Sequence, residues 1–229
     1  MSDARPRQVP AVHAARPITA DPLHETSLAM HLKATLAPEA IAELYGRFCQ
    51  GRGPFDAMMR KVVWRALARD CGDALVVAPG AGFRHLERIS LGAGVFVGEG
   101  AMLQGHAHGE CVIGDRVWIG PQAFLDARAL TVGDAVAIGP GARVLTAEHT
   151  GLPTEAAVMA TDQVLGPVRI GDGADVGVGA VVLPGRSIGR GAIVGAAAVV
   201  AHDLPDGAVA VGSPARVLRL RGEGPGARR

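Results

Sequence analysis

The chain has 229 residues and a net charge of +1, because 23 basic and 22 acidic side chains nearly cancel. Nothing in this balance indicates the concentrated basic surface that nucleic-acid-binding proteins usually carry, so no nucleic-acid partner is expected. Aromatic residues make up 3% of the chain, whereas glycine contributes 32 residues, which favours a core of aliphatic side chains at close backbone spacing. Composition therefore indicates an all-β repeat architecture.

The three cysteines, Cys49, Cys71 and Cys111, are odd in number and show no CxxC spacing, which argues against a disulfide framework. No apolar run approaches the ~20 residues that a membrane span needs. Residues 1–24 contain no apolar signal-peptide region. We therefore expect a soluble, cytoplasmic protein without a membrane partner.

Residues 1–24 are rich in Pro, Ala and Arg, and we expect them to form a flexible N-terminal arm. A helical segment is predicted over residues 25–72. Within it, the apolar residues of 38–50 and of 54–69 recur at the spacing of an amphipathic helix, and Gly51-Arg-Gly53 separates the two. The two helices are expected to pack against the domain that follows.

A six-residue repeat dominates the rest of the chain. In it an aliphatic residue, usually followed by a small one, recurs at Leu91, Val97, Leu103, Ile113, Ile119, Leu125, Val132, Ile138, Val144, Ile170, Val176, Val182, Ile188, Val194 and Val200. These fifteen positions form five groups of three, which predicts about five triangular coils of eighteen residues. Each repeat supplies one short strand and a corner, and only stacked coils bury the inward side chain. The pattern predicts a mainly β domain, a parallel β-helix.

The β-helix is predicted to span residues 73–200, with residues 73–90 as an imperfect opening coil. Residues 201–221 leave the six-residue period, and we expect them to cap the open end of the helix. Residues 222–229 are expected to form a disordered tail.

Departures from the period are few. Four extra residues lie around Gly-His-Ala-His-Gly at 105–109, one lies before Val132, and twenty lie between Val144 and Ile170. The strands of a solenoid are held by neighbours above and below, so an insertion leaves at a corner, and long insertions in compact domains are usually functional. The inserted loop 146–167 is therefore the first place to look for chemistry.

The repeats, the Thr146-Ala-Glu-His149 stretch that opens the loop and the closing Gly212-Ser-Pro-Ala-Arg216 resemble the hexapeptide-repeat acyltransferases. The resemblance is closest to the branch that contains maltose, galactoside and polysaccharide O-acetyltransferases, and it covers about residues 77–220. It implies a left-handed winding of the β-helix. It also implies a homotrimer with active sites between the β-helices of neighbouring subunits. It also implies acetyl-CoA as a co-substrate, a small-molecule acceptor and no metal ion.

In this family the histidine that opens the loop is the general base, and that position falls on His149. The chemistry agrees, because a hydroxyl group that attacks a thioester must lose its proton and imidazole titrates near neutral pH. Asp162 matches a family carboxylate that would orient the imidazole ring. The resemblance thus implies a coenzyme A-dependent acyltransferase that acylates a hydroxyl of a sugar or natural product by direct attack.

The resemblance also places the pantetheine arm of the donor. Gly177, Val178 and Ala196 match family positions whose main chain meets this arm. Tryptophan is common in the family shortly before this glycine, and Asp175 stands at that place here, which removes a large wall from the site.

For the adenosine phosphates, Arg216 and Arg219 match the C-terminal basic pair of the family. Guanidinium groups suit phosphates because they offer forked donors. Ala201 and His202 occupy a pair of cofactor-binding positions that is often Thr-Lys, so one phosphate-facing lysine is absent.

Four residues are candidates for binding the acceptor. Gln122 and Asp126 fall near the region where family members bind acceptor hydroxyls, opposite His149. His106 and His108 lie in the first corner insertion, and alternation in an extended segment puts both on one side.

Three different functions stay open at this point. A γ-type zinc carbonic anhydrase shares the fold and needs three histidines around an open metal position. His108 and His149 are available, but the family spacing requires a histidine where Val144 stands. An N-acetyltransferase that acts on an amino sugar is the second possibility, and a non-catalytic β-helical scaffold is the third.

Overall fold

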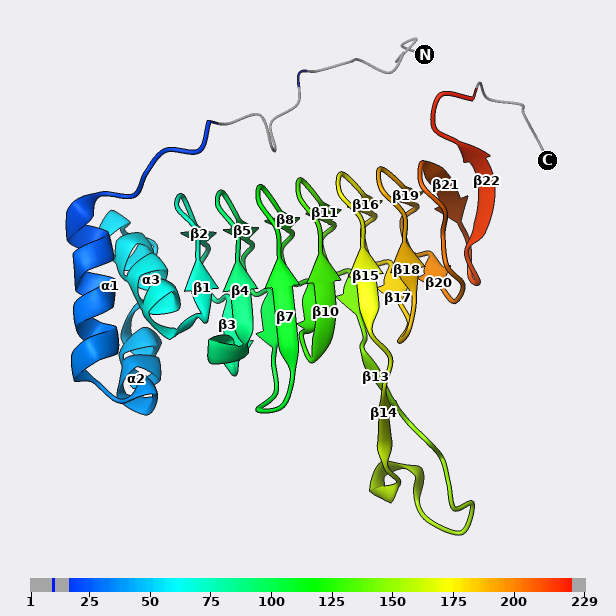
Figure 1. Cartoon of the computed structure of the whole chain (residues 1–229), viewed down its shortest axis with the longest axis horizontal. Coiled ribbons are helices and arrows are strands. Elements are labelled where there is room, and N and C mark those ends of the chain that lie inside the picture. The colour runs from blue at the N-terminus through cyan, green and yellow to red at the C-terminus, as the bar shows by residue number, and fades with distance from the viewer. Residues whose placement is uncertain (1–9, 11–16, 224–229) are drawn as a thin grey trace, which may run out of the picture.

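The structure is a computed structural model, and it describes residue 10 and residues 17–223. Three helices stand at one end, α1 (Leu23–Thr35), α2 (Pro38–Phe48) and α3 (Pro54–Leu67), and a solenoid of short strands follows (Figure 1). Most of the predicted flexible arm (1–24) and of the predicted tail (222–229) lies outside the described residues. The N-terminal helical segment and the parallel β-helix are confirmed.

The helices α2 and α3 correspond to the two predicted amphipathic segments, and α1 lies almost entirely within the predicted helical segment 25–72, where no separate helix was assigned to it. The buried residues of α1 are Ala29 and Leu32. Two buried positions do not make the broad apolar stripe by which an amphipathic helix is recognised in a sequence. In addition to the apolar contact of these two residues, Asp21, which precedes the helix, lies 2.8 Å from Nζ of Lys61 and 2.7 Å from Nη2 of Arg65 on α3. No helix of the described residues is long and apolar enough to cross a membrane.

Three sheets run along the solenoid, and each takes one strand from every turn. The first sheet contains β1 (Asp70–Cys71), β4 (Ile89–Leu91), β7 (Glu110–Ile113), β10 (Ala129–Val132), β15 (Val168–Ile170) and β18 (Ser187–Ile188). The second sheet contains β2 (Val76–Val77), β5 (Phe96–Val97), β8 (Trp118–Ile119), β11 (Ala137–Ile138), β16 (Asp175–Val176), β19 (Ile193–Val194), β21 (Ala208–Val211) and β22 (Arg216–Leu220). The third sheet contains β3 (Gly82–Arg84), β6 (Met102–Gln104), β9 (Phe124–Asp126), β12 (Arg143–Val144), β17 (Val181–Val182) and β20 (Val199–Val200).

Neighbouring strands in these sheets are parallel, except that β22 runs antiparallel to β21. The five predicted groups of three aliphatic residues fall on the turns that begin with β4, β7, β10, β15 and β18. One further turn precedes them, formed by β1, β2 and β3, in the region of the imperfect opening coil. The strands β21 and β22 continue beyond the last complete turn.

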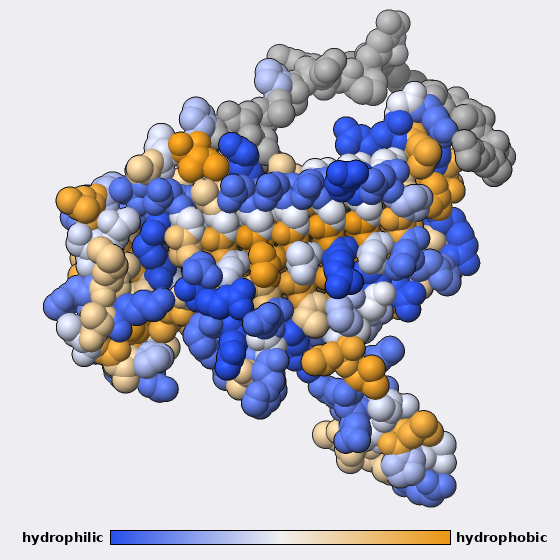
Figure 2. Space-filling view, in the orientation of Figure 1, coloured by the Kyte–Doolittle hydropathy of each residue, from blue (hydrophilic) through white to orange (hydrophobic). Residues whose placement is uncertain are grey.

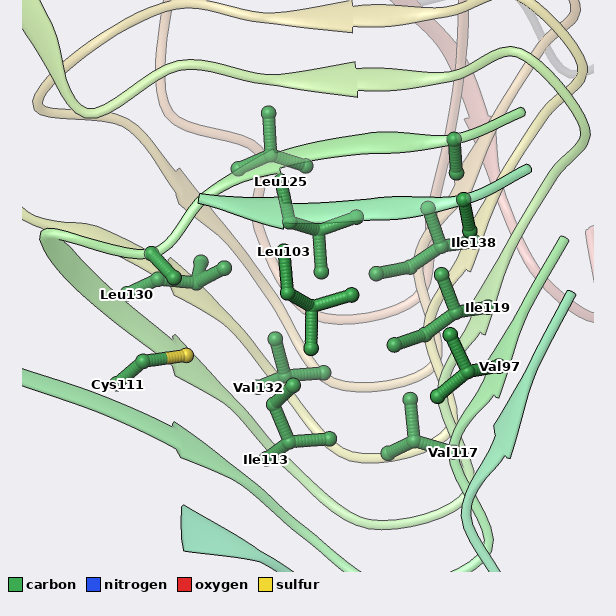
Figure 3. Packing of buried hydrophobic residues seen from close by; sticks show 14 of the residues in the cluster. Val97, Leu103, Cys111, Ile113, Val117, Ile119, Leu125, Leu130, Val132 and Ile138 are labelled. Carbon is green, nitrogen blue, oxygen red and sulfur yellow. The ribbon is translucent and has the colours of Figure 1, made fainter. Parts of the chain in front are cut away.

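Aliphatic side chains fill the interior of the solenoid (Figure 3). In the third sheet, Leu103 pairs in register with Leu125, and Leu125 with Val144, and all three side chains are fully buried. Each such burial contributes roughly 1.5–3 kcal/mol. The corners between turns are equally tight: a Cβ atom on Gly120 would lie 2.6 Å from the backbone nitrogen of Pro140. These contacts explain why small residues follow the inward aliphatic ones.

A long arm leaves the solenoid between β12 and β15 (Figure 1). Its root is an antiparallel hairpin of β13 (Ala147–His149) and β14 (Gln163–Leu165), and a short 3-10 helix, η2 (Val158–Ala160), lies farther out. We use the name "arm edge" for the edge of the solenoid where third-sheet strands lead to first-sheet strands. The insertion at 105–109 and a second 3-10 helix, η1 (Leu86–Arg88), lie at the same edge. The departures from the period thus gather along one side of the molecule.

Candidate active site

His149 ends strand β13 and lies opposite Gln163 in the arm hairpin. Its Nδ1 atom is 3.0 Å from the carbonyl oxygen of Thr161. A carbonyl oxygen only accepts hydrogen bonds, so Nδ1 carries the proton of the neutral ring and Nε2 keeps a lone pair. His149 is exposed, which leaves Nε2 within reach of a small molecule. The arrangement therefore offers a basic nitrogen at the root of the arm.

Gln163 links His149 to the wall of the solenoid. Its Nε2 atom is 3.2 Å from Nε2 of His149, and its Oε1 atom is 2.7 Å from Nη1 of Arg128. The same guanidinium donates through Nε and Nη2 to the two carboxylate oxygens of Asp126, at 2.7 Å each. A continuous chain of contacts thus runs from Asp126 on β9 through Arg128 and Gln163 to His149.

Asp126 is a buried carboxylate with several donors around it, since 3% of the residue is exposed. Burial by itself raises the pKa of Asp126, but hydrogen bonds from Arg128 and from the backbone N–H of Thr146 outweigh it and hold this pKa below its usual value. The hydrogen bond to Asp126 raises the pKa of Arg128. Both groups are therefore charged at neutral pH.

Asp162, the predicted orienting carboxylate, follows Thr161 directly. Its backbone carbonyl accepts a hydrogen bond from the N–H of Thr150 at 2.8 Å. The atom that contacts Nδ1 of His149 is the carbonyl oxygen of Thr161. An orienting role for the Asp162 carboxylate stays a prediction.

His106 and His108 both lie at the arm edge, with their ring centroids 5.6 Å apart. The His85 ring joins them, 6.0 Å from that of His106, and its Nδ1 atom is 2.9 Å from a carboxylate oxygen of Glu87. Throughout the described part of the chain, no group of three or more His, Cys, Asp or Glu side chains is placed to hold a metal ion. Contact of His106 and His108 with an acceptor stays a prediction.

Three of the predicted donor-binding residues come together at another edge of the solenoid, where second-sheet strands lead to third-sheet strands. We call it the glycine edge. A Cβ atom on Gly177 would lie 2.7 Å from the backbone nitrogen of Ala196, and the N–H of Ala197 donates to the carbonyl of Val178 at 2.8 Å. Val178 itself is 56% exposed. Gln122, predicted to bind the acceptor, also lies at this edge, with a φ of 58°.

The remaining predicted donor-binding residues lie elsewhere. Ala201 and His202 follow β20 at the arm edge, and His202 is exposed. Arg216 and Arg219 lie on β22, where Nη1 of Arg219 is 3.3 Å from the carbonyl oxygens of Leu220 and Glu223. The predicted donor-binding residues are therefore divided between the glycine edge, the arm edge and the terminal strands.

Sequence reasoning missed Arg128, Gln163 and Thr161. The two-residue spacing of Asp126 and Arg128 is visible in the sequence, but Gln163 meets His149 only because of the hairpin register. Thr161 contributes a backbone atom, for which a sequence carries no signal.

Comparison with known proteins finds several similar chains, among them proteins named as acetyltransferases. Nodulation protein L of Rhizobium meliloti is 42% identical over 128 residues, which cover 53% of this chain and 68% of that protein. A putative acetyltransferase of Schizosaccharomyces pombe is 40% identical over 97 residues, 42% of this chain and 45% of that protein. Galactoside O-acetyltransferase of Escherichia coli is 33% identical over 97 residues, 42% of this chain and 46% of that protein. No protein-family model matches the chain.

Solved structures share the fold. A hexapeptide-repeat acetyltransferase of Vibrio cholerae in complex with acetyl coenzyme A superposes with a TM-score of 0.56 at 24% identity, over 87% of this chain and 88% of that one. AntD, an N-acyltransferase of Bacillus cereus in complex with dTDP and 3-hydroxybutyryl-CoA, gives a TM-score of 0.63 at 20% identity, over 71% of this chain and 88% of that one.

Proposed function

This chain belongs to the hexapeptide-repeat acyltransferase family, and from that premise we propose that it transfers an acetyl or similar short acyl group from coenzyme A to a hydroxyl of a sugar or natural product. The observation that carries the proposal is the ring of His149. The Thr161 carbonyl binds the proton on Nδ1, so the lone pair of Nε2 is directed away from the arm backbone and suits a general base.

The proposed reaction is a direct transfer. The acceptor hydroxyl gives its proton to Nε2 of His149 as its oxygen attacks the thioester carbonyl carbon. The tetrahedral intermediate then collapses, the carbon–sulfur bond breaks, and the imidazolium returns the proton to the departing thiolate. Backbone N–H groups at a coil corner would stabilise the oxyanion, an effect worth about 3–4 kcal/mol when such donors are well placed.

The relatives support the donor, since the Vibrio cholerae structure contains acetyl coenzyme A and the AntD structure contains an acyl-CoA. In this chain we assign the pantetheine arm to Gly177, Val178 and Ala196, where the backbone approaches closely and Val178 is exposed. Arg216 and Arg219 are assigned to the adenosine phosphates, together with the Ala201-His202 pair.

We further propose that the site is completed by a second copy within a homotrimer. His149 belongs to the arm edge, whereas Gly177 and Val178 belong to the glycine edge. The arm also exposes apolar side chains along its length (Figure 2). These are Leu152, Val158, Met159, Val164 and Leu165, which are 49–84% exposed. The solenoid of a neighbouring subunit would cover these side chains, and its glycine edge would then face the arm edge of this subunit.

The test is a screen of the purified protein with acetyl-CoA and a panel of alcohols, sugars and amino sugars, in which release of the coenzyme A thiol is followed. We expect acceptor-dependent release, fastest with a hydroxyl acceptor. Faster release with an amine would replace O-acylation by N-acylation, as in AntD. Absence of release with every acceptor, together with no binding of coenzyme A, would favour a non-catalytic scaffold.

A further inference from the structure

The side-chain amide of Gln163 has a fixed orientation. An amide oxygen only accepts hydrogen bonds and an amide nitrogen only donates, while a guanidinium has no acceptor at all. Nη1 of Arg128 lies 2.7 Å from Oε1 of Gln163, and Nε2 of Gln163 lies 3.2 Å from Nε2 of His149. Arg128 therefore dictates that the N–H of the amide points to the imidazole ring.

The two contacts of the His149 ring agree on one tautomer. The amide N–H of Gln163 needs the lone pair of Nε2, and the carbonyl oxygen of Thr161 needs the proton of Nδ1. An amide turned by 180° would present its oxygen to Nε2 and favour a proton there. A ring with that proton has no lone pair on Nε2 and cannot act as a base through this atom.

Arg128 is anchored to the solenoid and not to the arm. Its two hydrogen bonds to Asp126 are parallel, the geometry that fixes a guanidinium most firmly. Asp126 in turn accepts a hydrogen bond from the backbone N–H of Thr146, two residues after the end of β12, and its backbone carbonyl accepts one from the Thr146 hydroxyl. The exposed fractions of the Arg128 and Asp126 side chains are 19% and 4%. The wall of the solenoid thus holds the group that orients Gln163.

We propose that Arg128 and Gln163 are positioning residues: Arg128 keeps the N–H of the Gln163 amide toward His149, and the amide in this orientation supports, together with the Thr161 carbonyl, the neutral tautomer with a lone pair on Nε2. The catalytic meaning of this inference rests on the proposed function, whereas the tautomer is a property of the free protein. During reaction, the acceptor hydroxyl takes the place of the Gln163 amide at Nε2.

Nitrogen-15 NMR of the full chain, at a pH where the ring is neutral, separates the two tautomers. The chain has 8 histidines, so the His149 signals are assigned by their absence from a His149→Ala sample. The unchanged protein should show the proton on Nδ1. In Arg128→Met, the tautomer with the proton on Nε2 should appear, with a shift in the tautomer ratio of about tenfold. Arg169→Met, which alters an exposed arginine on β15, should leave the ratio unchanged.

A second pair of variants, made in a protein without the Gln163 amide, distinguishes a turned amide from a general disturbance of the site by Arg128→Met. In Gln163→Met there is no amide to turn, and Thr161 remains as the ring contact. Adding Arg128→Met to this background should therefore leave the proton on Nδ1. The proposal is overturned if Arg128→Met keeps the original tautomer ratio, or if it changes the ratio equally with and without the Gln163 amide.

Arg128→Met leaves a buried carboxylate without its cation, which is costly. The paired variant Asp126→Asn/Arg128→Met removes both charges and serves as the second test if the single variant does not fold. It should show the same shift of the proton to Nε2, and an unchanged ratio in this folded variant would also overturn the proposal.

Kinetics give an independent measurement. With an acceptor found in the screen, Arg128→Met should lower kcat by about tenfold, a part of the ~10²–10⁴-fold contribution of a general base, while KM for acetyl-CoA stays within about twofold. A rise in KM with unchanged kcat would contradict a role in positioning the base. If the unchanged protein turns over no acceptor, the proposed function fails, but the NMR result still decides the tautomer.

Discussion

Arg128 and Asp126 stand two residues apart at the arm edge and form an ion pair through two hydrogen bonds of 2.7 Å each. This pair lies where the wall of the solenoid meets the arm, because Asp126 also binds the backbone of Thr146 and Arg128 also binds Gln163. The pair therefore connects the rigid repeats with the loop that carries His149.

The Asp126 carboxylate should make the free energy of unfolding depend on pH in the acidic range. Its pKa is lowered in the folded chain, so its contribution is fully present above the unfolded value of about 3.9 and is lost as the pH falls through the folded value. We expect Asp126→Asn to reduce the free energy of unfolding by about 2 kcal/mol at pH 7, a typical value for hydrogen bonds to a charged group.

The measurement is urea unfolding of both proteins between neutral pH and about pH 2, across the window set by the unfolded pKa. The difference in free energy of unfolding between the unchanged protein and Asp126→Asn should become smaller below about pH 4. Glu43→Gln, on the exposed face of α2, is the control and should be neutral. A difference that stays constant over the whole range would show that the charge of Asp126 does not stabilise the fold.

Two consecutive residues on β7 test whether the inward-pointing aliphatic side chains form the core of the solenoid. Ile113 is 1% exposed and points into the solenoid, whereas Val112 is 43% exposed on its outer face. Ile113→Ala should reduce the free energy of unfolding by about 2–5 kcal/mol, and Val112→Ala by less than about 0.5 kcal/mol. Denaturant unfolding measures both. Similar losses for the two variants would be incompatible with a core formed by alternate residues.

The three cysteines are free and should differ in reactivity. Burial raises the pKa of Cys111 to about 12 and that of Cys71 to about 11, so little thiolate forms at either residue near pH 8. Native protein treated with iodoacetamide should be alkylated first at Cys49, more slowly at Cys71, and at Cys111 only after unfolding. Peptide mass spectrometry measures the order. Equal rates at Cys49 and Cys111 in the native protein would contradict the burial.

A site shared between copies predicts complementation. His149→Ala removes the proposed base, and Val178→Asp places a charge on the proposed pantetheine surface. Each variant alone should be inactive, whereas assemblies that contain both should recover turnover, because one interface then combines an intact arm with an intact glycine edge. Thiol release by co-expressed variants measures the recovery, with each variant alone as the control. Mixed assemblies as inactive as their parents would mean that both residues of one chain serve the same site.

The repeat made most of the fold predictable. The inward ladder recurs every six residues because each turn must place an aliphatic side chain above the last, and Leu103, Leu125 and Val144 show this directly. The opening turn was only partly visible, since its first strand is the polar pair Asp70–Cys71. Helix α1 lies almost entirely within the predicted helical segment 25–72 but was not recognised as a separate helix, because its two buried residues, Ala29 and Leu32, form no broad apolar stripe.

The candidate site was predictable where a side chain belongs to a recognisable motif, as His149 does. The contacts around it depend on the register of the arm hairpin, which pairs His149 with Gln163 across an insertion without a repeat. Arg128 is held in position by its two hydrogen bonds to Asp126. The burial of Asp126 arises only when the corner of the solenoid has folded. Such contacts between distant segments are set by packing and have no local pattern in the sequence.

The most direct test of the account is the rate of coenzyme A thiol release from acetyl-CoA by His149→Ala, with the best acceptor from the screen. His31→Ala, which alters an exposed histidine on α1, is the matched control. We predict that His149→Ala lowers the rate by about 10²–10⁴-fold while binding of coenzyme A persists, and that His31→Ala has no effect. Full turnover by a folded His149→Ala protein would contradict the assignment of this histidine as the base.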